Sequence, residues 1–195
     1  MSMNEQKTRL TQDDAIAQAI SLNGRTQMMV RFRLAEQLYA LPIDYVDQIV
    51  EMVTIVPLPQ VNHSVEGVVN VRGAFVPAIN LRHHFGLPGI ELGLDTHIIL
   101  VRVGGRKLGL LVDQVVDVFS LTQPLSEPGE ILPASLGELG LLRGLAHTQE
   151  GLMFVLDLEQ IFDPVQVKAF TQSFDVLPEL VEATLEVAQR VEEGA

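Results

Sequence analysis

The sequence GVVNVRGAFVPAINLRHHF, residues 67–85, predicts a β-hairpin around which the chain can be interpreted. Two runs of β-branched or otherwise apolar residues, VVNV and AFVPAI, flank the dipeptide Arg72-Gly73. Gly73 permits the positive φ that a tight hairpin turn needs. Because side chains alternate along a strand, Asn70 and Arg72 share one face of the hairpin. The sequence therefore displays an arginine at the tip of an otherwise apolar hairpin.

The chain contains the same β pattern twice. Residues 32–49 align with residues 101–118 at an offset of 69, and residues 67–85 align with residues 144–162 at an offset of 77. The additional residues fall in a Pro/Gly-rich segment near residues 120–143, where insertions cost little. Two offsets in the same order predict two β-lobes of about five strands each.

The second copy helps to separate scaffold from function. Arg72 and Gly73 align with Gln149 and Glu150, so the hairpin itself does not require an arginine. Two interpretations remain open at this point: a surface charge that keeps the tip soluble, or a residue that contacts a partner.

Helices are predicted at both ends of the chain. Thr11 has the character of an N-cap with Asp14 as its capping-box partner, which predicts a short helix within an N-terminal arm of residues 1–25. The sequence from Leu177 to Glu192 carries an apolar stripe and predicts a helix in a C-terminal extension of residues 165–195. Packing against the chain itself and docking to a partner are both compatible with these helices.

Composition excludes several classes of protein. The 195 residues are 47% apolar, which is enough for a core, and include no cysteine, which excludes a disulfide framework and thiol catalysis. A formal net charge of −12 argues against nucleic acid or anionic lipid as the main partner, because both would be repelled. No apolar run is long enough to span a membrane, and no apolar signal core is present, so we expect a cytoplasmic protein.

The sequence offers little that resembles a catalytic or cofactor site. His83-His84 suggests a metal ligand pair, but no matching carboxylate spacing accompanies it. Asp113 and Asp117 are spaced like an acid–base pair, yet Asp44 repeats Asp113 in the first copy. A turn-stabilising Asp that binds nearby backbone amides explains that repetition better. With no phosphate loop or nucleophile motif either, we expect no enzyme activity, no metal and no cofactor.

These residues resemble one family, the CheW-like chemotaxis coupling (adaptor) proteins. The similarity lies in FRLAEQLYALPIDYVDQIV, in the Val56–Pro59 connector, in GVVNVRGAFVPAINLRHHFG and in LGLLVDQVVDVFSL. It covers residues 27–164, and VRG with the following Pro77 is its most specific part.

The resemblance implies a mainly β fold of two similar five-stranded, SH3-like or OB-like barrel lobes packed about a shared hydrophobic core. The CheW-like domain would span residues 26–164, with lobe one near 26–90, lobe two near 96–164, and an exchange of strands between them left open. The short N-terminal helix and the C-terminal helix would lie outside this domain.

The resemblance also implies a non-catalytic adaptor that binds the regulatory domain of a CheA-type histidine kinase and the cytoplasmic hairpin tip of chemoreceptors. The implied partner-binding residues are Arg72 with Asn70 and Gly73, and by position Val46, Gln48 and Ile98. Gln48 stands where the family usually has Glu. An adaptor of a type IV pili or other non-flagellar pathway is one alternative, and a small-ligand-binding β-barrel protein is another.

Overall fold

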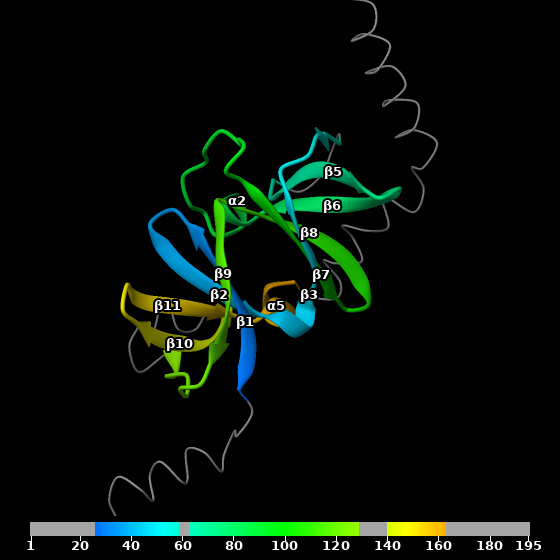
Figure 1. The fold of residues 1–195 in the computed structure, drawn as a ribbon. Helices are drawn as coiled ribbons and strands as arrows, with labels where there is room; N and C mark the ends of the chain where they lie inside the picture. The colour runs from blue at the N-terminus through cyan, green and yellow to red at the C-terminus, as the bar shows by residue number, and fades with distance from the viewer. Residues whose placement is uncertain (1–25, 59–62, 129–139, 163–195) are drawn as a thin grey trace, which may run out of the picture.

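The computed structural model describes residues 26–58, 63–128 and 140–162, which form a mainly β structure (Figure 1). The predicted helices after Thr11 and between Leu177 and Glu192 lie outside the described residues. The strands are β1 (Gln27–Leu34), β2 (Gln37–Pro42), β3 (Val46–Glu51), β4 (Ile55–Val56), β5 (Val65–Val71), β6 (Ala74–Asn80), β7 (His97–Val103), β8 (Arg106–Val112), β9 (Gln114–Leu121), β10 (Leu142–Thr148) and β11 (Gly151–Leu156). The short helices are η1 (Ile43–Tyr45), α2 (Leu81–His84) and α5 (Leu158–Ile161).

The strands form two sheets, as expected for two β-lobes. Sheet A has the order β10-β11-β2-β1-β9, and sheet B has the order β3-β7-β8-β6-β5-β4. Each sheet contains a hairpin from the other half of the chain: β1–β2 lies in sheet A, and β7–β8 lies in sheet B. The sheets therefore do not follow the contiguous segments 26–90 and 96–164, because each hairpin pairs in parallel with a strand from the opposite segment.

The two sheets repeat each other in register as well as in order. Ala78 pairs with Gly109 in the parallel β6–β8 contact, and Val155 pairs with Ala40 in the parallel β11–β2 contact. These pairs correspond at the two sequence offsets. The irregularities correspond too: Asp47 is skipped in the β3–β7 register, and Val116 is skipped in the β1–β9 register. The repeat detected in the sequence is thus a structural repeat with an exchanged hairpin.

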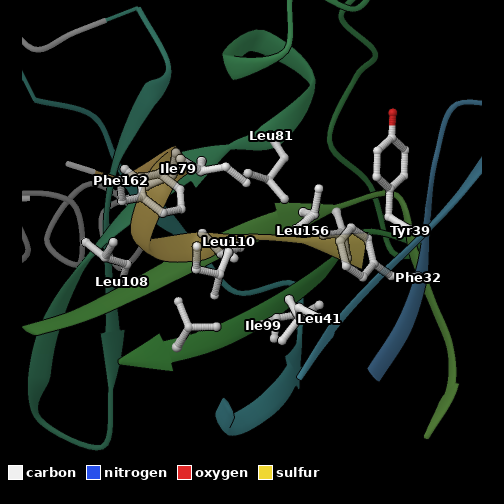
Figure 2. Packing of buried hydrophobic residues seen from close by; sticks show 14 of the residues in the cluster. Phe32, Tyr39, Leu41, Ile79, Leu81, Ile99, Leu108, Leu110, Leu156 and Phe162 are labelled. Carbon is white, nitrogen blue, oxygen red and sulfur yellow. The ribbon is translucent and has the colours of Figure 1, made fainter. Parts of the chain in front are cut away.

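The buried apolar side chains form three clusters. The largest lies between the two sheets and draws side chains from both, including Phe32, Ile79, Leu110 and Phe162, each fully buried. Figure 2 shows these side chains converging from strands of both halves. Burying a side chain of this size stabilises the fold by about 1.5–3 kcal/mol relative to leaving it exposed. Because this cluster is shared, neither half of the chain contains a complete core.

A smaller cluster fills the inner face of each sheet. In sheet A it contains Met29, Leu38, Ala40, Leu121, Ala146, Met153 and Val155. In sheet B it contains Val69, Val76, Ala78, Ile98, Leu100 and Leu111, with Val50 and Val71 packed at its margin. The interiors of both lobes are therefore occupied by the chain's own apolar side chains.

The two short helices α2 and α5 follow equivalent strands and begin in the same way. The side chain of Asn80 accepts hydrogen bonds from the backbone amides of the next turn, and the side chain of Asp157 does the same for α5. His84, at the end of α2, packs against Phe162 with ring centroids 5.3 Å apart. Burial lowers the pKa of His84, so the neutral imidazole is favoured at this contact.

Pro77 occupies a position in sheet B where proline is uncommon. It lies within β6, which has β5 on one side and β8 on the other. The parallel pairing with β8 begins only at Ala78, one residue later. Proline is tolerated here because no ladder hydrogen bond to β8 is required at its position.

Two equivalent glycines allow the close approach of neighbouring segments. A Cβ atom on Gly67 would lie 2.1 Å from the carbonyl oxygen of Val56, and Gly67 has a φ of +151°. A Cβ atom on its counterpart Gly144 would lie 2.6 Å from Cβ of Leu125. Both positions exclude larger residues because backbone or core atoms occupy the space.

We predict that Gly67→Ala destabilises the fold by about 2–3 kcal/mol, because the new methyl group forces β4 away from β5. The matched control is Gly93→Ala, since a Cβ atom at Gly93 would meet no atom within 4 Å. That control should change stability by less than about 0.5 kcal/mol. Urea unfolding of both variants measures the difference, and equal stabilities would contradict the close approach.

Candidate functional site

The candidate site is centred on the turn between β5 and β6. Arg72 has a φ of +54° and Gly73 a φ of +84°, as in a type I′ hairpin turn. The Gly73 amide donates a hydrogen bond of 2.9 Å to Oδ1 of Asn70, which holds the turn together. Arg72 is exposed. The sequence therefore places a guanidinium on a well-defined hairpin tip.

The charge of Arg72 is available for an interaction. Within residues 26–58, 63–128 and 140–162, Arg72 makes no salt bridge, whereas Arg31 pairs with Asp117 and Arg82 pairs with Asp113. An arginine presents a planar, permanently charged group that matches a carboxylate or a pair of carbonyls. The geometry at the tip is thus suited to recognition of such groups on another molecule.

The backbone at Arg72 is unusual for a residue with a side chain. Positive φ costs such a residue about 1–2 kcal/mol relative to glycine. The equivalent turn at Gln149-Glu150 avoids this strain by placing the positive φ at the following Gly151, which has a φ of +119°. The fold can therefore build this hairpin without a strained arginine, and strain of this kind is concentrated at functional sites.

The strand registers place two other predicted residues at the same end of sheet B as Arg72. β6 and β8 run parallel, so the turns that precede them, at Arg72-Gly73 and at Gly104-Gly105, lie at one end of the sheet. β3 is antiparallel to β7, and Val46 at its start pairs with Val101 near the end of β7. The beginning of β3, with Val46 and Gln48, therefore belongs to this end as well.

The predicted residues differ in how accessible they are. Gln48 is partly buried opposite Leu100, and Val46 packs against the largest apolar cluster, which lies between the two sheets. Ile98 corrects the prediction of a partner contact, because its side chain has 0% exposure and belongs to the inner cluster of sheet B. It can support the surface from beneath but cannot touch a partner in this conformation.

Sequence reasoning missed a group of charged residues at this end of sheet B. Asp47 Oδ2 lies 2.9 Å from Arg102 Nη2 and 2.9 Å from Lys107 Nζ. The hydrogen bond from Lys107, with the nearby Arg102, lowers the pKa of Asp47. Arg106 begins β8 beside them. Aligning the two copies would have found this group, since Arg106 and Lys107 align with Gln37 and Leu38.

The aspartates that resemble an acid–base pair are engaged in structural contacts. Asp117 forms a bidentate ion pair with Arg31, and this pairing lowers the pKa of Asp117. Asp113 accepts the Ala35 amide at 2.6 Å and two donors from Arg82, each at 2.6 Å. Asp113 thus binds a backbone amide as predicted, but that amide belongs to the turn between β1 and β2 and is distant in the sequence. Neither carboxylate is arranged as a general acid or base.

His83 and His84, the predicted histidine pair, lie in different surroundings. His83 stacks on His63 with centroids 5.0 Å apart and lies 2.9 Å from Glu66 Oε1, while His84 faces Phe162. In the part of the chain that the structure describes, no three His, Asp or Glu side chains are grouped as metal ligands.

Comparison with known proteins agrees with this architecture. The family model of the CheW-like domain matches residues 28–166. The chain belongs to the CheW-like family. The chemotaxis protein CheW of Thermotoga maritima is 30% identical over 140 residues, covering 72% of this chain and 90% of that protein. The chemotaxis protein CheW of Klebsiella aerogenes is 30% identical over 148 residues, covering 75% of this chain and 89% of that protein.

A solved structure of the family supports the same fold. The crystal structure of the scaffolding protein TtCheW from Thermoanaerobacter tengcongensis matches with a TM-score of 0.63 and 29% sequence identity. The match covers 73% of this chain and 91% of that one. Within the described ranges of this CheW-like chain, no helix is long and apolar enough to cross a membrane.

We predict that Arg72→Asn stabilises the protein by about 0.5–1 kcal/mol, because Asn-Gly is the preferred dipeptide of a type I′ turn. Gln149→Asn is the matched control, since Gln149 has no positive φ, and it should change stability by less than about 0.5 kcal/mol. Thermal and urea unfolding measure both variants. A loss of stability in Arg72→Asn would show that Arg72 supports the fold rather than straining it.

Proposed function

We propose that this CheW-like chain is a non-catalytic adaptor that couples chemoreceptor signalling domains to a CheA-type histidine kinase in the cytoplasm. The observation that carries the proposal is the exposed Arg72, which has no ion-pair partner within the described residues and occupies a strained turn that the second copy builds without it. A residue that the fold does not need, held in a costly conformation, fits a role in recognition.

The proposed receptor contact is the end of sheet B that carries the β5–β6 turn. Arg72 supplies the charged group, while Asn70 and Gly73 fix the direction in which it projects. Val46 and Gln48 lie on β3 at the same end of sheet B. The membrane-distal hairpin tip of a chemoreceptor offers backbone carbonyls and carboxylates of the kind that a guanidinium binds. Gln48 leaves this surface without the negative charge that the family usually has there.

The kinase is the second proposed partner, through its regulatory domain. In this proposal residues 26–164 form the binding unit, and residues 1–25 and 165–195 flank it. The formal net charge of −12 is consistent with protein partners and disfavours nucleic acid and anionic lipid. A role in a non-flagellar chemosensory pathway would use the same surface with a different receptor.

Two features weigh against the alternatives from other classes. A small-ligand-binding barrel needs an internal cavity, but apolar side chains of the chain itself occupy the interiors of both lobes. An enzyme needs free titratable groups, but Asp113 and Asp117 are each tied to an arginine.

We predict that Arg72→Ala weakens binding of a chemoreceptor signalling fragment at least about tenfold, because truncating an interface arginine typically costs about 2 kcal/mol or more. The stability of the fold should be nearly unchanged, because alanine at position 72 has about the same conformational cost at positive φ as arginine. Arg72→Lys should restore binding only in part, because an ammonium group cannot reproduce the paired donors of a guanidinium. Isothermal titration with the receptor fragment and with the kinase regulatory domain measures these affinities.

The matched control is Gln149→Ala, which shortens the side chain at the equivalent turn in sheet A. This variant should leave receptor binding unchanged. Melting temperatures of all variants separate lost contacts from lost structure. Receptor affinity that is unchanged in Arg72→Ala, or that falls only with unfolding, would refute the proposed contact.

A further inference from the structure

The outer edge of sheet A exposes apolar side chains. β9 is the last strand in the order of sheet A, and among the described strands only β1 pairs with it. Next to this edge, the side chains of Met28 on β1 and of Val116 and Val118 on β9 are 41%, 38% and 45% exposed. We name these three residues the edge patch. An apolar strand edge of this kind is a template for further contacts, and folded proteins usually cover it.

The edge patch continues the core of the protein. Met28 lies opposite Ser120 and Val30 lies opposite Val118, so these four side chains share one face of the β1–β9 pair. Ser120 Oγ donates a hydrogen bond of 3.1 Å to Sδ of Met28. Val30 is fully buried in the largest apolar cluster. Met28 and Val118 therefore extend that cluster to the surface.

The equivalent edge of sheet B has a different character. At the offset of 69, Met28, Val116 and Val118 correspond to His97, Asp47 and Ile49. Asp47 is paired with cations, and Ile49 packs against the largest apolar cluster. The fold can therefore build this strand pair without an exposed apolar patch, and the patch in sheet A calls for a separate explanation.

Residues 1–25 join the described structure beside the edge patch. β1 begins at Gln27, which pairs with Leu121 at the end of β9, and the next residue is Met28. Figure 1 shows the described chain beginning at this end of β1. Residues 24–26 can span about 10 Å when extended. Because so short a tether gives an effective concentration in about the millimolar range, even a weak contact between residues 1–23 and the patch would be occupied.

The predicted N-terminal helix has an apolar side that suits this patch. After the N-cap Thr11, the apolar residues Ile16, Ala19 and Ile20 recur at helical spacing on one side. A single helix of about twelve residues is only marginally stable in water, so it needs a surface on which to bury that side. Its length of about 18 Å is less than the roughly 26 Å covered by the eight residues of β9.

We propose that the helix predicted within residues 11–23 packs its side carrying Ile16 and Ile20 across the edge patch and covers the open edge of β9. Charge favours this occupant. Residues 1–25 contain three acidic and three basic residues, whereas residues 165–195 contain six acidic and two basic residues. A second copy of the chain would bring its whole formal net charge of −12. An acidic protein repels both of these alternatives more than it repels a neutral segment.

The test is the rate at which a maleimide labels a cysteine placed in the patch of the full chain. Because the chain contains no cysteine, V118C supplies a single thiol. Adding I16D/I20D should speed its labelling at least about fivefold, since aspartates cannot pack on an apolar patch and the edge opens. Q18D/S21D adds the same charges to the opposite side of the helix and should change the rate less than about twofold.

A second thiol position controls for general loosening of the structure. V53C replaces a side chain that is 38% exposed in the connection between β3 and β4 of sheet B. Its labelling rate should be the same with and without I16D/I20D. Melting temperatures of the variants should agree with that of the original chain to within a few degrees, because the substitutions lie outside the shared core.

The other outcomes overturn the inference. Equal labelling of V118C with and without I16D/I20D would show that the helix does not cover the patch. Labelling that slows as the protein concentration rises, and is indifferent to I16D/I20D, would assign the patch to a second copy. Labelling that speeds up only when residues 165–195 are removed would assign it to that segment. Equal acceleration at V118C and V53C would show that residues 1–25 support the whole fold rather than this edge.

Discussion

The parallel pairing of each hairpin with a strand from the opposite half is the constraint on which the structure depends. β8 pairs with β6, and β2 pairs with β11, in the same register. Each sheet is therefore completed by the other half of the chain, and the largest apolar cluster lies between the sheets. This exchange also places the β7–β8 turn beside the β5–β6 turn. The surface that we propose for the receptor is thus a product of the exchange.

The repeat supplies an internal comparison in which the differences between copies become informative. On one side, Arg82 links α2 to Asp113, which also accepts the Ala35 amide from the other sheet. The corresponding positions on the other side are Glu159, Asp44 and Gly104, where no arginine is available to make the same link. One junction between the sheets is therefore clamped by an ion pair that the other does not have. The two equivalent junctions therefore differ in their charged side chains, although the repeat makes their backbones alike.

Much of the fold could be predicted from the sequence, because the apolar alternation and the two offsets indicate the strands and their repetition along the chain. The predicted hairpin of residues 67–85 is present as β5 and β6, and it turns at Arg72-Gly73. The exchange could not be deduced, since equivalent strands from either copy offer the same pattern to a neighbour. Ile98 was assigned to the partner surface by its position in the resemblance, and the apolar run IILV, residues 98–101, does not by itself reveal which side chains are covered on both faces. The strain at Arg72 and the contacts of Asp113 depend on tertiary structure and left no local signal.

The central claim is that the end of sheet B carrying Arg72 receives the receptor. Amide hydrogen exchange of the full chain, with and without a chemoreceptor signalling fragment at saturating concentration, tests it most directly. The account predicts slower exchange at residues 70–74, at the start of β3 and at the β7–β8 turn, with β10 and β11 unchanged. Slower exchange confined to β9, β10 and β11, with residues 70–74 unaffected, would contradict it.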